Sequence, residues 1–248
     1  MIDIHSHLLY GVDDGSETLE DSIELLKKAQ SDGIRDIILT PHYIRNGEYR
    51  LKAKDIIKRY HDFIKEVKDY TDINLYIGNE LYIHSELDNM ILMKDILSLN
   101  NSKYVLVEFP FREYKDDYDE YLYNLDTLGY KIIIAHPERY KYVKDDKNFV
   151  RRWTDCGYLL QVNQNSLNKN DTRHMIYDWV AKGYVYFIAS DAHNEYRPCI
   201  LSDAYKNIVK NFNKDLADRL LISNPKCVLE DKDISKMPIV KKKFLGLF

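Results

Sequence analysis

Residues near the start of the chain have the types and spacing of metal ligands. His5 and His7 end a short apolar segment, and the acidic turn Asp13-Asp14-Gly15 follows within a few residues. In an extended backbone the side chains at i and i+2 point the same way, so both imidazoles can face one cation. The turn can return a carboxylate oxygen to the same place. An ordinary strand and an ordinary turn would give the same pattern, so the later strands must decide between the two interpretations.

Polar side chains end all seven of the strands that the sequence predicts. Parallel β/α barrels carry their chemistry at the carboxyl ends of the strands, where side chains distant in sequence meet in one pocket. Chance could explain one or two such endings, but it does not explain the whole series. The residues at the equivalent ends are His5, His42, Glu80, Glu108, His136, Asn163 and Asp191.

Three cation positions follow from charge and reach. The first would be held by His5, His7, Glu80 and Asp191, the second by Glu80 as a bridge with Glu108 and His136, and the third by Asp14, His42 and His193. Mixed imidazole and carboxylate ligands suit Mn, Fe or Zn, and the lack of cysteine ligands argues against a structural zinc site. Divalent cations about 3.5 to 4 Å apart lower the pKa of a bridging water and stabilise both oxygens of a phosphoryl transfer. The predicted nucleophile is therefore hydroxide and not a side chain.

Two arginines follow the predicted ligands closely. Arg139 comes three residues after His136, and Arg197 comes four residues after His193. A guanidinium group binds phosphate bidentately and stays charged. An isolated arginine would more often form a surface salt bridge, but the position of these two beside the strand ends favours phosphate binding.

The elements that must position these residues alternate between strand and helix along the whole chain. We expect strands at residues 1–4, 36–40, 74–79, 103–107, 131–135, 158–162 and 185–190. We expect helices from Ser16 or Thr18 to about residue 32 and near 56–67, 85–93, 116–128, 148–156, 172–181, 203–211 and 214–221. Such alternation predicts an α/β fold in which parallel strands are covered by helices, as in a seven-stranded β/α barrel.

Composition narrows the class of protein. The 248 residues suffice for one barrel domain, and the net charge of -4 offers no general attraction for nucleic acid. The sequence has neither the pattern of a signal peptide nor an apolar segment long enough to span a membrane, so we expect a cytoplasmic protein. None of Cys156, Cys199 and Cys227 has an arginine in the next six positions, which argues against a cysteine-dependent phosphatase.

The combined motifs resemble a known family. They are His5-Ser6-His7, Asp13-Asp14-Gly15, Thr40-Pro41-His42, Glu80, Glu108, His136-Pro137-Glu138-Arg139 and Ser190-Asp191-Ala192-His193. This set resembles the PHP (polymerase and histidinol phosphatase) superfamily. The chain is most similar to the bacterial tyrosine-protein phosphatases of capsule and exopolysaccharide operons, the CpsB/CapC/YwqE type, up to about Asn224-Pro225.

The resemblance implies a distorted seven-stranded barrel and a site with three divalent cations. Manganese is the cation expected first, with Fe, Zn or Mg as alternatives. It also implies hydrolysis of phosphotyrosine on the tail of a bacterial tyrosine autokinase that controls polysaccharide synthesis, and so an indirect proximity to the membrane. We expect a PHP phosphatase domain at 1–230 and a polar, basic C-terminal tail at 231–248. The tail is expected to be frayed.

Three other functions remain compatible with the motifs. A phosphatase of the histidinol-phosphate class would share the metals but act on a small molecule. A metal-dependent phosphodiesterase or nuclease would use the same site, although the net charge and the missing basic tract weigh against it. A noncatalytic docking protein would have no need of the complete ligand set.

Overall fold

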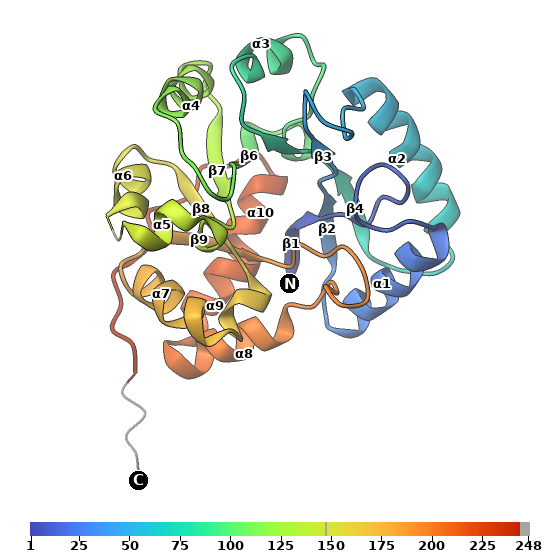
Figure 1. The fold of residues 1–248 in the computed structure, drawn as a ribbon. Coiled ribbons are helices and arrows are strands. Elements are labelled where there is room, and N and C mark those ends of the chain that lie inside the picture. The colour runs from blue at the N-terminus through green and yellow to red at the C-terminus, as the bar shows by residue number, and fades with distance from the viewer. Residues whose placement is uncertain (147, 244–248) are drawn as a thin grey trace.

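The computed structural model describes residues 1–146 and 148–243, in which helices surround two parallel sheets (Figure 1). The strands are β1 Ile2–Ser6, β2 Asp36–Leu39, β3 His42–Tyr43, β4 Asn74–Ile77, β5 Glu80–Tyr82, β6 Tyr104–Glu108, β7 Lys131–Ala135, β8 Leu159–Asn163 and β9 Val185–Ala189. The helices are α1 Leu19–Ser31, α2 Ala53–Val67, α3 Leu87–Leu92, α4 Asp117–Thr127, α5 Lys141–Asp145, α6 Phe149–Asp155, α7 Asn170–Ala181, α8 Ser202–Asn211, α9 Lys214–Asp218 and α10 Asn224–Leu229. Short 3₁₀ turns lie at Leu99–Asn101, Pro137–Arg139 and Gln164–Leu167, and a π-helical turn lies at Arg219–Ser223.

The α/β class and the parallel strands agree with the prediction, but the strand count does not. One sheet has the order β1-β2-β4 and the other the order β3-β5-β6-β7-β8-β9, and every pair is parallel. The described residues thus form nine strands in two sheets, where the sequence predicted seven in one barrel.

The two extra strands arise from interruptions in predicted strands. Pro41, which has no N–H to donate to a ladder, separates β2 from β3, and Gly78-Asn79 separates β4 from β5. His42 and Glu80 are therefore the first residues of β3 and β5, where they lie opposite each other in the register. The expectation that Glu80 ends a strand was wrong, although its position beside the other ligands is unaffected.

Helix α1 shows how local sequence sets an element. Thr18 caps the helix, because its side chain accepts from the backbone of Asp21 while the Asp21 carboxylate accepts from the backbone of Thr18. Leu25, Leu26 and Ala29 bury one face of the helix. The capping box fixes the start of α1 at Leu19, a short distance after the Asp13-Asp14-Gly15 turn.

Two hydrophobic cores lie on opposite faces of the strands. The larger core joins the strands to the surrounding helices. The smaller one contains Ile4, Ile38, Leu106, Ile133 and Phe187 from five different strands, together with Val228 of α10. The smaller core therefore joins strands of both sheets.

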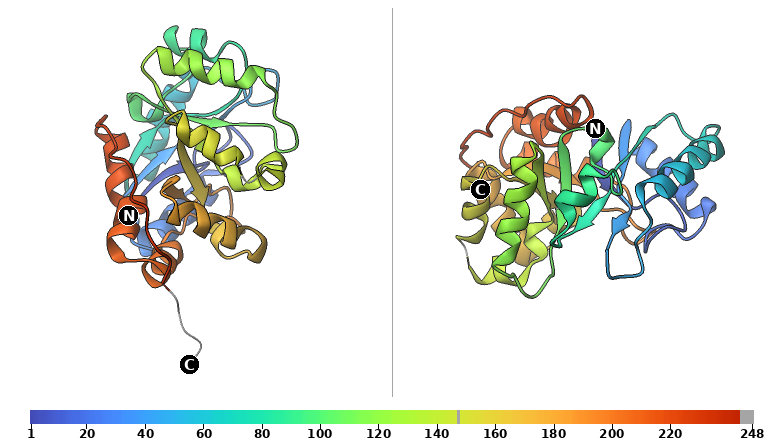
Figure 2. Two further views of the ribbon diagram at one scale, coloured as in Figure 1. Left: turned by 90° about the vertical axis from the view of Figure 1, so that its left-hand side faces the viewer. Right: turned by 90° about the horizontal axis from the view of Figure 1, so that it is seen from above.

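The C-terminal segment is packed, contrary to the expectation of a frayed tail. Met237 is 4% exposed, and the N–H of Val240 donates to the carbonyl of Ala181 at 2.9 Å. The hydroxyl of Tyr104 donates to the carbonyl of Lys232 at 2.7 Å. Figure 2 shows this red segment along the side of the molecule. The prediction for 244–248 falls outside the described residues.

A membrane-spanning helix would need a long apolar run. Among the described helices, none is both long and apolar enough to cross a bilayer.

Candidate metal centre

The structure brings all nine predicted ligands into one cluster. Most of these side chains are buried. Asp14 is the exception, because its side chain is 50% exposed and lies at the edge of the cluster. Five of the eight histidines of the chain belong to this cluster. Its members are His5, His7, Asp14, His42, Glu80, Glu108, His136, Asp191 and His193.

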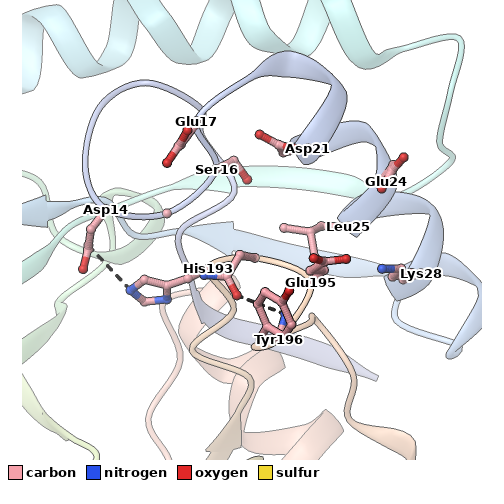
Figure 3. Close-up of a pocket in the computed structure, with 12 residues that line it drawn as sticks. Asp14, Ser16, Glu17, Asp21, Glu24, Leu25, Lys28, His193, Glu195 and Tyr196 are labelled. Atoms are coloured by element: carbon pink, nitrogen blue, oxygen red, sulfur yellow. Dashed lines mark hydrogen bonds and ion pairs between the residues drawn. The ribbon is translucent and has the colours of Figure 1, made fainter.

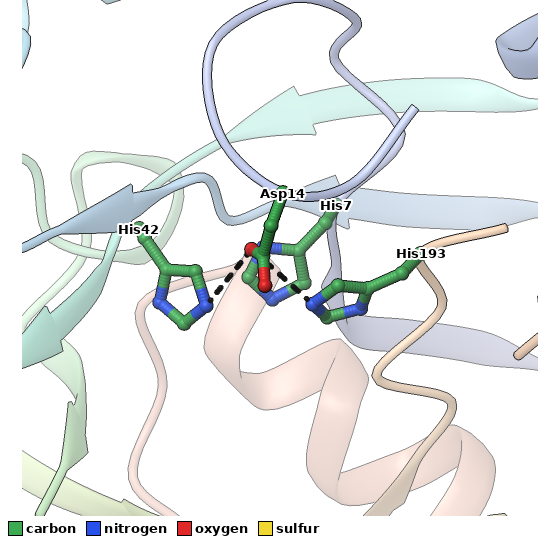
Figure 4. Close-up of side chains that lie close together, drawn as sticks. All are labelled: His7, Asp14, His42 and His193. Atoms are coloured by element: carbon green, nitrogen blue, oxygen red, sulfur yellow. Dashed lines mark ion pairs between the residues drawn. The ribbon is translucent and has the colours of Figure 1, made fainter. Parts of the chain in front are cut away.

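Three groups of side chains within the cluster could each hold an ion. In each group the ligand atoms lie within 4.8 Å of one another, and the groups are His7, Asp14, His42 and His193; His5, His7 and Glu80; and His42, Glu80 and Glu108. Figure 4 shows the first group, with His42 and His193 on either side of Asp14. His7, His42 and Glu80 each belong to two of the groups, and the Glu80 carboxylate lies 2.9 to 3.3 Å from the imidazoles of four histidines, which places it at the centre of the cluster.

These groups differ slightly from the three predicted positions. The first group contains the predicted Asp14, His42 and His193 and adds His7. His136 lies beside the third group, with its Nε2 2.9 Å from Glu80 Oε1 and 3.6 Å from Glu108 Oε1.

Asp191 lies between the histidines of the cluster. Its Oδ1 is 3.5 Å from His5 Nε2, 3.6 Å from His7 Nε2 and 3.5 Å from His193 Nδ1. This oxygen is thus available to the same ion as the histidines of the second group.

Acceptor groups outside the cluster orient its histidines. His5 Nδ1 lies 2.8 Å from Gln161 Oε1, and His7 Nδ1 lies 2.7 Å from Asp13 Oδ2. Because an amide or carboxylate oxygen only accepts, each Nδ1–H donates and each Nε2 keeps a lone pair for a metal. Neither Gln161 nor Asp13 was among the predicted site residues. Asp13 belongs to the acidic turn beside the predicted ligand Asp14, whereas nothing in the local sequence marks Gln161.

The lone pairs of several side chains in the cluster face one another, and this arrangement indicates whether metal ions would fit between them. His5 Nε2 and His7 Nε2 are 3.2 Å apart. His42 Nδ1 is 3.0 Å from Glu80 Oε2, yet both atoms are buried without a hydrogen-bond partner among the described residues. Buried acceptors that converge without donors require a cation or a proton between them. The donor set of imidazole and carboxylate groups therefore fits divalent ions.

Without a metal ion, bound protons can offset the negative charges of the cluster, and the pKa values of its side chains show where these protons are held. Burial acts to lower the pKa of His7, but the negative charges of Asp13 and Glu80 outweigh it and raise that pKa well above the usual range. Burial lowers the pKa of His136 to about 4 and, with the charge of Glu80, raises the pKa of Glu108. A bound cation would replace the shared protons.

Unusual backbone conformations aim two of the ligands. His136 follows β7 with φ of 32°, and Asp191 follows β9 with φ of 52°. Left-handed backbone is costly for residues other than glycine and persists where the surrounding structure imposes it. At Gly15 the chain passes so close to His7 that an added Cβ would lie 2.0 Å from its carbonyl oxygen. The turn that carries Asp14 thus requires glycine.

Both predicted arginines lie beside the cluster. Arg139 Nη1 is 3.0 Å and Arg197 Nη2 is 2.6 Å from Asp191 Oδ2, and Asn163 Nδ2 donates to the same oxygen at 2.6 Å. Asp191 therefore connects the two guanidinium groups to the histidines that surround its other oxygen. About a third of each arginine side chain is exposed, which leaves donors free for an anion.

A cavity of about 590 Å³ opens onto the cluster, and we call it the metal cavity. Arg139, Arg197, His42, Glu80 and Glu108 are among its lining residues. Its outer wall is apolar, formed in part by Ile44, Tyr49, Tyr82, Pro110 and Phe111. The guanidinium carbon of Arg139 lies 4.6 Å from the centre of the Phe111 ring. The metal cavity thus combines two arginines beside the metal-ligand cluster with an aromatic rim.

Comparisons with known proteins match the whole chain. The family model described as capsular polysaccharide synthesis, CpsB/CapC, matches residues 1–230. The tyrosine-protein phosphatase CpsB of Streptococcus agalactiae serotype V is 33% identical over 242 residues, which cover 93% of this chain and 99% of that protein. The putative tyrosine-protein phosphatase CapC of Staphylococcus aureus is 34% identical over 261 residues, with 100% of both chains covered.

Solved structures agree in fold. A structure from a crystallographic study of YwqE from Bacillus subtilis and CpsB from Streptococcus pneumoniae, described as metal-dependent tyrosine phosphatases, superposes with a TM-score of 0.91 at 30% identity. It covers 98% of this chain and 99% of that one. A phosphotriesterase homology protein from Escherichia coli, with a TM-score of 0.59, 14% identity and coverage of 90% and 96%, shares the fold alone.

Proposed function

The chain belongs to the CpsB/CapC family of capsular polysaccharide synthesis, and on that premise we propose that it is a metal-dependent protein-tyrosine phosphatase. It hydrolyses a phosphoric monoester and transfers the phosphoryl group to water. The observation that carries the proposal is the cluster of nine potential ligands onto which the metal cavity opens; six of them line that cavity, together with both arginines and the aromatic rim.

The proposed enzyme binds three cations. His5, His7, Glu80 and Asp191 would hold the first, Glu80, Glu108 and His136 the second, and Asp14, His42 and His193 the third, with His7 and His42 close enough to be shared. Manganese is the proposed ion, with Fe, Zn and Mg as alternatives. Bound cations would supply Lewis-acid activation of water and neutralise charge on the phosphate.

The residues around the ligands position the substrate. Arg139 and Arg197 bind the phosphate oxygens, while Asp191 Oδ2 holds both guanidinium groups in place. The exposed ring of Phe111, beside Arg139, packs against the tyrosyl ring. A phenolate has a parent pKa near 10, so it leaves more readily than an alkoxide and demands less of a general acid.

The physiological setting extends the proposal. The substrate is the phosphotyrosine tail of a bacterial tyrosine kinase of polysaccharide synthesis, and the enzyme acts in the cytoplasm without binding nucleic acid. Residues 1–230 form the phosphatase domain, in keeping with the extent of the family match, and 231–243 pack on it as a C-terminal extension.

The two sheets are proposed to act as one distorted seven-stranded barrel. Each of the interrupted pairs, β2 with β3 and β4 with β5, counts as one strand of that barrel. Support comes from the parallel bridge between Ser6 and Ala192, which joins β1 to the segment after β9. The His7 N–H donates to the Ala192 carbonyl at 2.8 Å in the same place.

Hydrolysis by metal-stripped protein tests the function. Parallel samples receive Mn, Mg or Zn, and one sample receives no metal. Phosphate release is then measured from a phosphotyrosyl peptide and from histidinol phosphate. We expect metal-dependent release from the peptide and little from histidinol phosphate. Preference for histidinol phosphate would replace the proposal with a small-molecule phosphatase, and folded, metal-loaded protein that releases no phosphate would indicate a noncatalytic role.

A further inference from the structure

A second cavity adjoins the metal cavity. It has a volume of about 400 Å³ and lies between the start of α1 and the loop that follows β9 (Figure 3). Asp14 and His193 line both cavities and form the boundary between them. We call the second cavity the acidic groove, and its charged lining residues are Asp14, Glu17, Asp21, Glu24, Lys28 and Glu195.

The acidic groove carries five carboxylates against one lysine. Asp21 is already used to cap α1. Glu17, Glu24 and Glu195 are exposed, and within the described part of the chain none of them forms an ion pair with a basic side chain. Their charges add to a negative potential in the groove that favours cations and disfavours phosphate.

A buried hydroxyl in the groove lacks a partner. Ser16 is 1% exposed, and its Oγ has no hydrogen bond among the described residues. The backbone around it is fixed, because the N–H of Ser16 donates to the His7 carbonyl at 3.0 Å and its carbonyl accepts from Gly11 at 2.9 Å. Figure 3 shows the Ser16 side chain turned into the groove. A buried polar atom left unpaired is costly, so a ligand that donates to Ser16 Oγ would recover that cost.

We propose that the acidic groove binds the side chain of a lysine or arginine that flanks the phosphotyrosine of the substrate; this rests on the proposed function. Ammonium and guanidinium groups offer only donors, while the carboxylates and Ser16 Oγ can accept. The two cavities share a wall, so a peptide whose phosphate lies in the metal cavity passes the groove. The opposite preferences of the two cavities then set the direction in which the peptide binds.

A peptide series tests the preference directly. Each phosphotyrosyl peptide in the series carries lysine, alanine or glutamate at a single varied position. The varied position is one of the two residues that precede the phosphotyrosine or one of the two that follow it. We expect lysine to raise kcat/KM over glutamate by about three- to tenfold at one or more positions, the range for a few partly exposed ion pairs. The difference should shrink as salt is added, because the groups are accessible to solvent.

Two variants locate the effect. In E17Q/E24Q/E195Q the lysine preference should fall to less than twofold, while hydrolysis of p-nitrophenyl phosphate, which has no peptide, stays at the wild-type rate. The control E20Q/D69N/E120Q removes the same charge from exposed carboxylates outside the groove, and it should keep the preference. Ser16→Ala should weaken the preference without changing turnover of p-nitrophenyl phosphate.

Each outcome has a separate meaning. Equal turnover of lysine and glutamate peptides, or a preference that survives in E17Q/E24Q/E195Q, would overturn the groove proposal and leave the phosphatase intact. Wild-type protein that hydrolyses p-nitrophenyl phosphate but none of the peptides would instead contradict the proposed protein substrate.

Discussion

The metal cavity and the acidic groove share Asp14 and His193 but are built in opposite ways. The cluster onto which the metal cavity opens consists, apart from Asp14, of largely buried histidines and carboxylates, and partners such as Gln161 and Asp13 orient two of its histidines. In the groove the carboxylates are exposed, and those of Glu17, Glu24 and Glu195 form no ion pair within the described part of the chain, whereas Asp21 caps α1 and Asp14 lies beside His42 and His193. Charges interact strongly when water is excluded and weakly when it is not. The charges of the buried cluster therefore interact more strongly with one another and with a bound ligand than the exposed charges of the groove do.

The largest expected effect comes from the centre of the metal cavity. Glu80→Gln should lower kcat for a phosphotyrosyl peptide on the order of a thousandfold or more, because Glu80 belongs to two of the three candidate ion groups. The metal content of the protein should fall as well. Glu113→Gln, an exposed carboxylate that lines the same cavity outside the cluster, is the control and should remain active. Full activity in Glu80→Gln would remove the metal centre from the mechanism.

An arginine variant separates phosphate binding from metal binding. Arg139→Ala should reduce kcat/KM about a hundredfold, as expected for loss of a charged group that contacts the reacting phosphate. Metal content should be retained, because Arg197 and Asn163 still hold Asp191 Oδ2. Arg151→Ala, on the exposed surface of α6, should match the wild type. Loss of metal from Arg139→Ala would show that Arg139 acts through Asp191 and not on the substrate.

The aromatic rim should affect one class of substrate. Phe111→Ala should lower kcat/KM for phosphotyrosine about tenfold, through the loss of packing against the tyrosyl ring. Turnover of an alkyl phosphate such as glycerol phosphate should be unchanged. Tyr123→Ala removes an exposed aromatic ring outside the metal cavity and serves as the control. An equal loss for both substrates would mean that Phe111 positions Arg139 instead of the tyrosyl ring.

The smallest effect is expected in the acidic groove. Lys28→Glu replaces the basic residue among those lining the groove and should increase the lysine preference of the peptide series about twofold, the scale of an exposed charge. Lys27→Glu makes the same change on the same helix outside the groove. If both variants shifted the preference equally, the selectivity would come from net charge and not from the groove.

Much of the metal cluster could be predicted because strand ends are visible in sequence. His136 and Asp191 follow apolar segments directly, and parallel strands bring such positions to one face. The strand count could not be predicted with the same certainty, because one proline at position 41 and Gly78-Asn79 interrupt segments whose apolar pattern is otherwise continuous.

The expectation of a frayed tail failed for a related reason. Met237 begins a short apolar run that charged residues flank, and Ile239 in the same run is 85% exposed, so the local pattern does not mark which side chain is buried. Burial of that one side chain, and hydrogen bonds to partners as distant in sequence as Tyr104, hold the segment in place. A few contacts of this kind leave no periodic signal.

The sequence by itself determined which residue types form the cluster of candidate ligands, their order along the chain and the family to which the chain belongs, because these depend on local pattern. Only the tertiary structure decided which atoms face each other. Gln161 orients His5 from 156 residues away, and Asp14 and His193 lie between the metal cavity and the acidic groove. Such relations depend on burial and on contacts between distant segments, and these arise only when the chain has folded.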